Sequence, residues 1–228
     1  ILYHSSFEGA LGSKATLDDY ANFIKACFLL YTIDDDLNKL SLANKLISIV
    51  MEIFYDKNIC DFYFSNKKNS DLFMKTKNIL DSATQSASSI MLENLYKNSF
   101  FFSDRNYINL IEDIIKNNWA RVRSGPISYI GFLKAAHLVI SEPNFIVLFK
   151  KDGFYKEIKD CLLKFNTFFT LSFIKKENMV PKKSPAYGKK LVNNKTTVYV
   201  CGRFTCSSPI SNMEEMTDWF NKNSFIKI

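Results

Sequence analysis

Apolar side chains recur every three or four residues through most of the first 140 positions, which is the spacing of one face of an α-helix. The first series runs through Tyr20, Ile24 and Tyr31 and predicts a helix over about 17–32. Four further series predict four more helices, with stripes formed by Leu40, Ala43, Leu46 or Ile47, Val50 and Phe54, by Ala83, Ala87, Ile90 or Met91 and Leu95, by Tyr107, Ile111, Ile114 or Ile115 and Trp119, and by Ile130, Leu133, Ala136 or His137 and Ile140. Because short connections join consecutive helices, we expect antiparallel helical hairpins over residues 1–142.

The pattern changes after Glu142-Pro143. Residues 144–149 and 168–173 are short apolar runs of strand length, and the stretch between them has helical spacing. A further strand is expected over 196–201, before a last helix at the C-terminal end. Strand, crossover helix and strand predict a small α/β region over residues 143–228 with some parallel pairing. The predicted fold class is therefore mainly α, with helical hairpins followed by a small α/β element.

The positive charge needs a closer look before it indicates a partner. The net charge is +7, but 26 of the 30 basic residues are Lys and only 4 are Arg. Recognition of phosphates and bases relies on the planar Arg fork. We therefore interpret the charge as a solvated Lys surface, and nucleic acid is not an expected partner. Residues 174–195, with seven Lys and one acid, predict a solvated, mobile loop, and a polyanion-binding face there is the alternative.

The cellular compartment is inferred from the lack of transmembrane and signal segments in the sequence. No run of about 18 uncharged apolar residues exists, so a transmembrane helix is not expected. The chain starts at Ile1, without a Met or a signal peptide, and we expect it to be part of a longer protein. An intracellular protein, cytoplasmic or mitochondrial and not secreted, is predicted. Its five cysteines are then expected to be reduced.

The stretch Thr16-Leu17-Asp18-Asp19-Tyr20-Ala21 places two carboxylates and a phenol at the start of the first predicted helix. Thr16 followed by Asp19 resembles a capping box, and Asp18 in the first turn suits the helix dipole. The same carboxylates could instead project into a cavity, as proton donors or as acceptors for sugar hydroxyls. The residues alone favour capping and leave the chemistry open.

Three other polar residues have the same double interpretation. Asp81 precedes a predicted helix and is either its N-cap or a polar group that lines a site. His137, on a helix among apolar neighbours, is predicted to be a partly buried structural histidine, with catalysis as the alternative. His4, in a predicted loop beside Ser5 and Ser6, fits either role.

Cys201 and Cys206 close the last predicted strand. Their spacing suits a disulfide or two metal ligands, but no second Cys or His pair lies nearby in the sequence, so a zinc site is not expected. A Gly-rich phosphate loop, a Cys-x-x-Cys motif, a Gly-x-Ser-x-Gly elbow and a His-Glu-x-x-His motif are all absent. No cofactor or metal is predicted.

Three landmarks occur in order along the chain. They are Leu17-Asp18-Asp19-Tyr20-Ala21, Asp81-Ser82-Ala83-Thr84-Gln85-Ser86, and the segment from Tyr199-Val200-Cys201 through Cys206 to Pro209. Together they resemble the C-terminal part of the spermatogenesis-associated, thioredoxin-domain-containing protein family. The resemblance implies part of an (α/α)6 toroid of the six-hairpin type found in sugar epimerases and glycosidases. It also implies an N-terminal thioredoxin-like domain in the same protein as a partner.

The resemblance implies a carbohydrate-binding or carbohydrate-isomerising chain with a small sugar as its ligand. The catalytic residues would be Asp18, Asp19 and Asp81, and the ligand would contact Tyr20, His4, His137 and Ser86. The alternative is a non-catalytic scaffold for a redox-active thioredoxin-like domain or a protein partner, with Cys201 and Cys206 as redox candidates. The sequence does not decide whether the chain is an enzyme.

Overall fold

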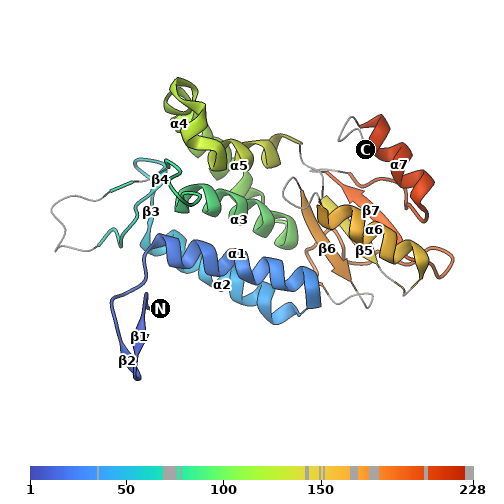
Figure 1. The fold of residues 1–228 in the computed structure, drawn as a ribbon, viewed down its shortest axis with the longest axis horizontal. Coiled ribbons are helices and arrows are strands. Elements are labelled where there is room, and N and C mark those ends of the chain that lie inside the picture. The colour runs from blue at the N-terminus through green and yellow to red at the C-terminus, as the bar shows by residue number, and fades with distance from the viewer. Residues whose placement is uncertain are drawn as a thin grey trace. The chain divides into compact units, whose positions relative to one another are not determined.

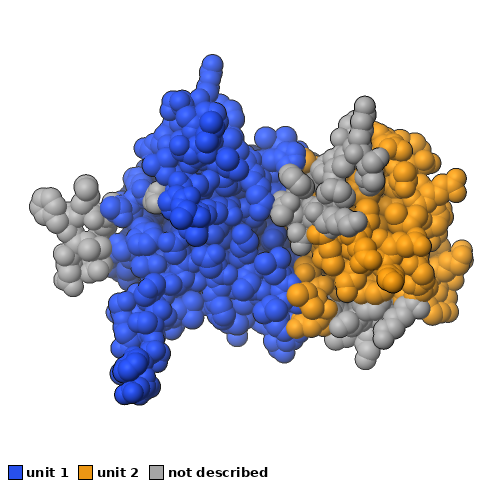
Figure 2. Space-filling view, viewed as in Figure 1, with its two compact units in different colours: residues 1–31, 36–140 blue, residues 32–35, 141–228 orange. Residues whose placement is uncertain are grey.

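The computed structural model describes residues 1–34, 36–68, 76–77, 79–141, 144–148, 150, 152–164, 169–174, 180–202 and 205–223. The chain divides into two compact units, shown in Figure 2: a helical unit of residues 1–31 and 36–140, and a C-terminal unit of residues 32–35 and 141–228. The predicted boundary at residues 142 and 143 lies outside the described residues. The fold is mainly α, as predicted. None of the described helices is long and apolar enough to cross a membrane.

The first 141 residues hold five α-helices and two short hairpins in the part that the structure describes (Figure 1). In chain order the elements are β1 (Ser6–Phe7), β2 (Ala10–Leu11), α1 (Leu17–Asp34), α2 (Leu37–Ile53), β3 (Tyr55–Asp56), β4 (Asp61–Phe62), α3 (Ala87–Phe102), α4 (Arg105–Ser124), a 3-10 turn (Pro126–Tyr129) and α5 (Ile130–Ser141). The β1–β2 hairpin lies where a loop was expected. Its turn residues Glu8 and Gly9 have positive φ angles of 48° and 84°, which suits a two-residue hairpin turn.

Side-chain caps set several helix ends. Asp36 caps α2 by accepting a hydrogen bond from the Asn38 backbone N–H. Ser103 ends α3 in the left-handed conformation, and Asp104 then caps α4. These two residues turn the chain directly from one helix into the next.

Helix α3 is the central helix of the helical unit, and Figure 1 shows it between the α1–α2 and α4–α5 pairs. Nearly all of its residues are buried, including polar ones. Asn94 donates from Nδ2 to the carbonyl oxygen of Ala21 on α1 at 2.9 Å. Asn98 donates to Oδ1 of Asn44 on α2 at 3.0 Å. Of the predicted stripe, Ala87, Ile90, Met91 and Leu95 are buried, whereas Ala83 is exposed and precedes the helix. Most other residues of α3 are buried as well, because helices contact it on several sides.

Two other predicted stripes are confirmed only in part, because Ile111 and Ile114 of α4 and Ala136 of α5 are buried but other members are exposed. On α4, Trp119 is 48% exposed, and on α5, Ile130 and Ile140 are 62% and 80% exposed. The buried faces are instead formed by Ile108, Ile111, Ile114, Asn118 and Val122 on α4, and by Gly131, Phe132, Ala135, Ala136, Leu138 and Val139 on α5. Both helices carry apolar residues on more than one face, so the period alone does not identify the packed face.

Asp81 connects the starts of two helices. Its carboxylate accepts hydrogen bonds from the backbone N–H of Ser86, at 2.9 Å, and of Gly131, at 2.6 Å. Ser86 is the N-cap of α3, so the prediction of Asp81 as that cap is wrong. A Cβ atom on Gly131 would lie 2.5 Å from Cγ of Gln85 and 2.8 Å from Oδ1 of Asp81. Glycine is therefore required here for the close approach of α5 to the 81–86 turn.

The C-terminal unit contains a three-stranded mixed sheet in the order β6-β5-β7. Its elements are β5 (Asn144–Leu148), α6 (Gly153–Lys164), β6 (Thr170–Ile174), β7 (Thr197–Cys201) and α7 (Met213–Lys222). Strands β5 and β6 pair in parallel across α6, which confirms the predicted strand–helix–strand unit, whereas β7 pairs antiparallel to β5. The core is formed where α6 and α7 pack on the strands, among Phe145, Val147, Ile158, Leu162, Met216 and Phe220. Of the predicted strand residues, Phe149 and Phe168 lie outside the described part.

Residues 180–195 form a largely exposed loop, as predicted, but part of the loop is packed. Val180, Ser184 and Ala186 are buried, and Tyr199 of β7 donates from its hydroxyl to the carbonyl oxygen of Lys190 at 2.8 Å. The lysines extend outward from this packed backbone, which explains how a Lys-rich segment can still fold. Residues 175–179 lie outside the described part.

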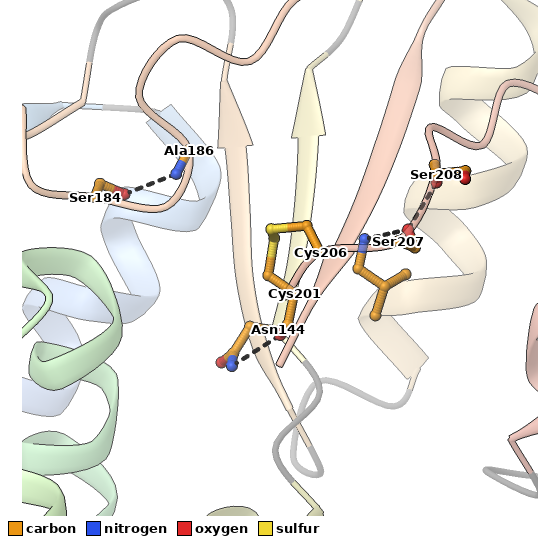
Figure 3. Close-up of a disulfide and its surroundings, with 8 residues drawn as sticks. Asn144, Ser184, Ala186, Cys201, Cys206, Ser207 and Ser208 are labelled. Atoms are coloured by element: carbon orange, nitrogen blue, oxygen red, sulfur yellow. Dashed lines mark hydrogen bonds between the residues drawn. A yellow bond between two sulfur atoms is a disulfide. The ribbon is translucent and has the colours of Figure 1, made fainter. Parts of the chain in front are cut away.

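Cys201 and Cys206 form a disulfide at the end of β7, shown in Figure 3. Asn144 of β5 donates to the carbonyl oxygen of Cys201 at 3.2 Å, and Gly202 donates to Thr205 at 2.9 Å. Of the alternatives that the sequence left open, the structure has the disulfide. The expectation of fully reduced cysteines is therefore wrong for this pair, whereas Cys27, Cys60 and Cys161 are not disulfide-bonded.

We predict that Gly131→Ala lowers the free energy of unfolding by roughly 1–3 kcal/mol, because the new methyl group overlaps Gln85 and Asp81. Urea unfolding followed by far-UV circular dichroism measures the loss. Gly125→Ala is the matched control, since nothing lies within 4 Å of a Cβ atom at that position. Equal stability of the two variants would contradict the packing described for Asp81.

We predict that replacing Cys201 and Cys206 by Ser lowers the stability of the C-terminal unit by about 2 kcal/mol, because the disulfide restricts a small loop in the unfolded chain. Reductant should lower the stability of the native chain equally and leave the double variant unchanged. Thermal melts with and without reductant measure both effects. Two additional alkylated thiols in the native, unreduced chain would refute the pairing.

Candidate functional site

At the start of α1, Asp19 acts as a cap. Its Oδ2 atom accepts hydrogen bonds from the backbone N–H of Thr16, at 2.8 Å, and from the Thr16 hydroxyl, at 3.1 Å. His4 Nδ1 lies 3.0 Å from the same carboxylate. Burial opposes ionisation of Asp19, but the hydrogen bonds from His4 and Thr16 outweigh it and lower its pKa. Asp19 therefore stays ionised, which suits capping and makes it a poor proton donor.

Asp18 has different surroundings. It is half-buried, and burial, helped by the charge of Asp19, raises the pKa of its carboxyl group. No hydrogen bond to its carboxylate is formed among the described residues. Positions 18, 22 and 25 follow the helical spacing, so Asp18, Asn22 and Lys25 share one face of α1. Asp18 is thus the expected site residue that keeps an available carboxylate.

Tyr20 and Ser86 have structural roles. Tyr20 is 1% exposed, its hydroxyl accepts a hydrogen bond from the backbone N–H of Leu2, and its ring packs edge-on against Phe54. Ser86 is buried, and its hydroxyl contacts the carbonyl oxygen of Ile79 and the hydroxyl of Ser89. Tyr20 fixes the N-terminal segment at Leu2 to α1, and Ser86 caps the start of α3. The structure therefore gives both residues a structural role.

Asp81 and His137 complete the expected set. Both carboxylate oxygens of Asp81 are occupied by the backbone N–H groups of Ser86 and Gly131. His137 is exposed on α5, so the prediction of a partly buried histidine is wrong. The structure therefore brings His4 to Asp19, but it uses most of the expected residues to hold helix ends in place.

A polar cluster that sequence reasoning missed lies where α1, α3 and α5 meet. Glu93 of α3 is 2% exposed. Its Oε1 atom accepts a hydrogen bond from Gln85 at 2.6 Å, and its Oε2 atom pairs with the Lys134 ammonium group of α5 at 3.0 Å. Lys25 of α1 donates to Oε1 of Gln85 at 3.4 Å. Together with Lys97, one helical turn after Glu93, these residues are called the Glu93 cluster.

Lys97 is the unusual member of the Glu93 cluster. Burial, and secondarily the positive charges of Lys134 and Lys25, lowers its pKa to about 8, although the charge of Glu93 opposes the shift. Both oxygens of Glu93 already have partners, Gln85 and Lys134. Perturbed amines next to a buried carboxylate are common in functional sites, which makes this cluster the candidate site.

One sequence signal could have revealed the cluster. Glu93 and Lys97 are the only charged residues between Ser82 and Ser103, and they are four positions apart. A lone charged pair in a long uncharged helix is expensive to bury unless it is paired or functional. Gln85 belongs to the second family landmark, but its link to Glu93 and Lys25 depends on tertiary packing.

Metal binding is not indicated in the part of the chain that the structure describes, where no group of three or more His, Cys, Asp or Glu side chains converges. The donors of the Glu93 cluster are mostly ammonium groups, which carry no lone pair while protonated. Cys201 and Cys206 are joined to each other in the C-terminal unit. The Glu93 cluster supplies hydrogen-bond donors and acceptors and groups that exchange protons.

Comparison with known proteins gives one informative similarity. The chain is 25% identical over 212 residues to "Uncharacterized protein B0495.5" of Caenorhabditis elegans. The matched region covers 92% of this chain and 29% of that protein, so the chain spans less than a third of its relative. No protein-family model matches the chain.

Proposed function

We propose that the helical unit binds a small sugar at the Glu93 cluster, as part of an (α/α) toroid of helical hairpins, and that isomerisation is the reaction it supports. The observation that carries the proposal is the buried Glu93 carboxylate, 2% exposed and held by both Gln85 and Lys134. The resemblance of the sequence to proteins with a sugar-epimerase-like toroid favours the same class of ligand.

The chemistry of the cluster suits hydroxyl groups. A sugar hydroxyl donates one hydrogen bond and accepts others, so it needs both kinds of partner close together. The cluster supplies a carboxylate from Glu93, an amide from Gln85 and ammonium groups from Lys25 and Lys134. Because these come from four segments of the chain, the ligand would be fixed in orientation as well as bound.

Isomerisation next to a carbonyl needs groups that accept and donate a proton. Asp18 is the best carboxyl candidate on α1, because its raised pKa brings its protonated form closer to neutral pH and its carboxylate has no hydrogen bond among the described residues. It shares a helix face with Lys25, which contacts Gln85. Asp19 and Asp81 are assigned to capping and to the 81–86 turn instead, with their oxygens bonded to Thr16, Ser86 and Gly131.

We predict that glucose, mannose, galactose or maltose binds the native chain, and that Glu93→Gln weakens binding about tenfold or more because a charged hydrogen-bond acceptor is lost. Isothermal titration calorimetry measures the affinities. Glu52→Gln, a neutral substitution at an exposed position on α2, is the matched control and should bind as the native chain does. A melting curve for each variant separates lost binding from lost folding, since Glu93→Gln also removes the partner of Lys134.

The same experiment can refute the proposal. Absence of heat and of isomer formation for every sugar, with a folded native chain, would exclude the Glu93 cluster as a sugar site. Equal weakening by Glu93→Gln and Glu52→Gln would place the sugar elsewhere.

A second candidate function is a scaffold that holds a thioredoxin-like domain or another protein. Phe23 and Leu30 favour it: they lie seven positions apart, on the same face of α1, and are 43% and 46% exposed. Large apolar side chains that share an exposed helix face are typical of docking surfaces.

The scaffold role predicts that the double variant Phe23→Ser, Leu30→Ser no longer binds the separately expressed N-terminal part of the full-length protein. Its melting temperature should stay within about 3 °C of the native value, because both side chains are exposed. Biolayer interferometry measures this binding. Lys45→Ser, at an exposed position on α2, is the control. Unchanged binding by the double variant would remove this face of α1 from the interface.

A further inference from the structure

The Cys201–Cys206 disulfide closes a very short piece of chain. The two cysteines pair across an antiparallel bridge, five positions apart in the sequence, with their Cα atoms 3.9 Å apart. A disulfide stabilises a fold mainly by restricting the unfolded chain, and the effect decreases as the closed loop becomes shorter. This pair therefore stabilises the C-terminal unit less than a link between distant segments would.

Backbone hydrogen bonds close the same hairpin on both sides of the disulfide. On the inner side, the Gly202 N–H donates to the carbonyl oxygen of Thr205 at 2.9 Å. On the outer side, the Ser207 N–H donates to the carbonyl oxygen of Val200 at 2.7 Å. Because none of these bonds involves sulfur, the two cysteines stay next to each other when the S–S bond is broken. Two thiols that are held together in this way re-form their disulfide quickly.

The two cysteines differ in their access to solvent. Cys201 is fully buried, with 0% exposure, whereas Cys206 is partly exposed and follows the exposed Thr205. Figure 3 shows the disulfide beside the segment that continues to Ser207 and Ser208. Thiol–disulfide exchange needs a thiolate to reach only one of the two sulfur atoms. Cys206 is thus the cysteine that an incoming thiolate reaches, and the Cys201 sulfur is the leaving group.

The sequence around the pair is positively charged. Residues 178–213 contain five Lys and one Arg but no Asp or Glu. Lys190 and Lys195 are exposed, and the hydroxyl of Tyr199 on β7 donates to the carbonyl oxygen of Lys190 at 2.8 Å. Positive charge attracts a negatively charged reactant and favours a thiolate over a thiol. This segment therefore favours the approach of a thiolate to the disulfide.

We propose that Cys201 and Cys206 form a redox-active disulfide that exchanges with the thiols of a partner dithiol. Cys206 forms the mixed disulfide with the partner, and Cys201 is the resolving cysteine that restores the internal bond. The short loop, the backbone bonds that hold the pair and the unequal exposure of the two cysteines carry this assignment. The pair lies in the C-terminal unit, so its chemistry does not depend on the sugar site proposed at the Glu93 cluster.

The exchange balances between this chain and the partner. A thiolate of the partner attacks the Cys206 sulfur, the S–S bond breaks, and its electron pair leaves with the Cys201 sulfur, which takes up a proton. The second thiol of the partner, as a thiolate, then attacks the partner's own sulfur in the mixed disulfide. This releases the Cys206 thiolate, which also takes up a proton. The partner is oxidised to a disulfide, and this chain is reduced to a dithiol by two electrons and two protons.

Reduction of the native chain tests the access that the proposal requires. Dithiothreitol is the dithiol probe at pH 7, N-ethylmaleimide stops the reaction, and peptide mass spectrometry measures the label at each cysteine. Label at Cys206 should appear at a rate that changes less than about twofold between 0 and 1 M urea, because the native fold already exposes this cysteine. Cys27, which is 4% exposed, is the internal control and should stay unlabelled. A rate at Cys206 that rises steeply with urea would overturn the proposal, because reduction would then require unfolding.

Two single variants test the separate roles of the cysteines. With glutathione disulfide, Cys201→Ser should form a mixed disulfide at Cys206 about tenfold or more faster than Cys206→Ser forms one at Cys201, because Cys201 is buried. Far-UV circular dichroism shows that both variants are folded. Equal rates, or faster reaction at Cys201, would overturn the assignment of Cys206 as the attacked cysteine.

The reduced native chain tests the resolving step. When glutathione disulfide is added, the Cys201–Cys206 bond should re-form without accumulation of glutathione at Cys206, because Cys201 is held beside it. The Cys201→Ser variant, which lacks the resolving sulfur, should accumulate that mixed disulfide. Accumulation to the same level in both chains would overturn the role of Cys201, whatever the outcome of the sugar titrations.

Discussion

The pairing of buried polar groups along α3 is the constraint on which the helical unit depends. Asn94 and Asn98 bind α1 and α2, and Glu93 binds Gln85 and Lys134. The side chains of Glu93, Asn94 and Asn98 are almost fully buried, so the loss of a hydrogen-bond partner would lower the stability of the fold. The positions of α1, α2 and α5 around α3 are therefore fixed by specific hydrogen bonds as well as by apolar packing. Further bonds bring the ammonium group of Lys134 to the Glu93 carboxylate and that of Lys25 to Gln85.

This arrangement carries a cost at neutral pH. The pKa of Lys97 is lowered in the folded chain, so its side chain binds a proton less tightly there than in the unfolded chain. The contribution of Lys97 to stability is consequently unfavourable below pH 8, and it becomes less so as the pH rises from about 8 toward the ordinary value of a lysine. A half-buried lysine with a pKa lowered in this way is a common feature of functional sites. Asp81 shows the opposite case, because its two backbone partners make it part of the framework.

Much of the fold could be predicted from the sequence, because local patterns determine it. The helical spacing through Tyr20 and Ile24 gave α1, and the two apolar runs around α6 gave the parallel pair β5–β6. The packed faces of α4 and α5 could not be predicted in the same way, since Trp119 and Ile140 are as apolar as the residues that are buried. Only the positions of the neighbouring helices decide which face is covered.

The candidate site was harder to predict than the fold. The acidic residues near helix starts have the type and position expected of catalytic groups, yet Asp19 and Asp81 accept hydrogen bonds from backbone N–H groups. The Glu93 cluster combines residues from α1, the 81–86 turn, α3 and α5 that are up to 109 positions apart, from Lys25 to Lys134. No local pattern contains that combination, although the isolated charges of Glu93 and Lys97 in α3 were visible in the sequence.

The ionisation of Lys97 tests the central claim most directly. The chain can be prepared with carbon-13 at the lysine ε-position, and NMR can follow each ε-carbon as the pH is raised, with Lys97→Arg used to assign the signal. The account predicts that the Lys97 signal titrates near pH 8, well below the signals of exposed lysines such as Lys116. Titration of Lys97 together with the exposed lysines would contradict it, because the surroundings at the Glu93 cluster would then not disfavour the charged ammonium group.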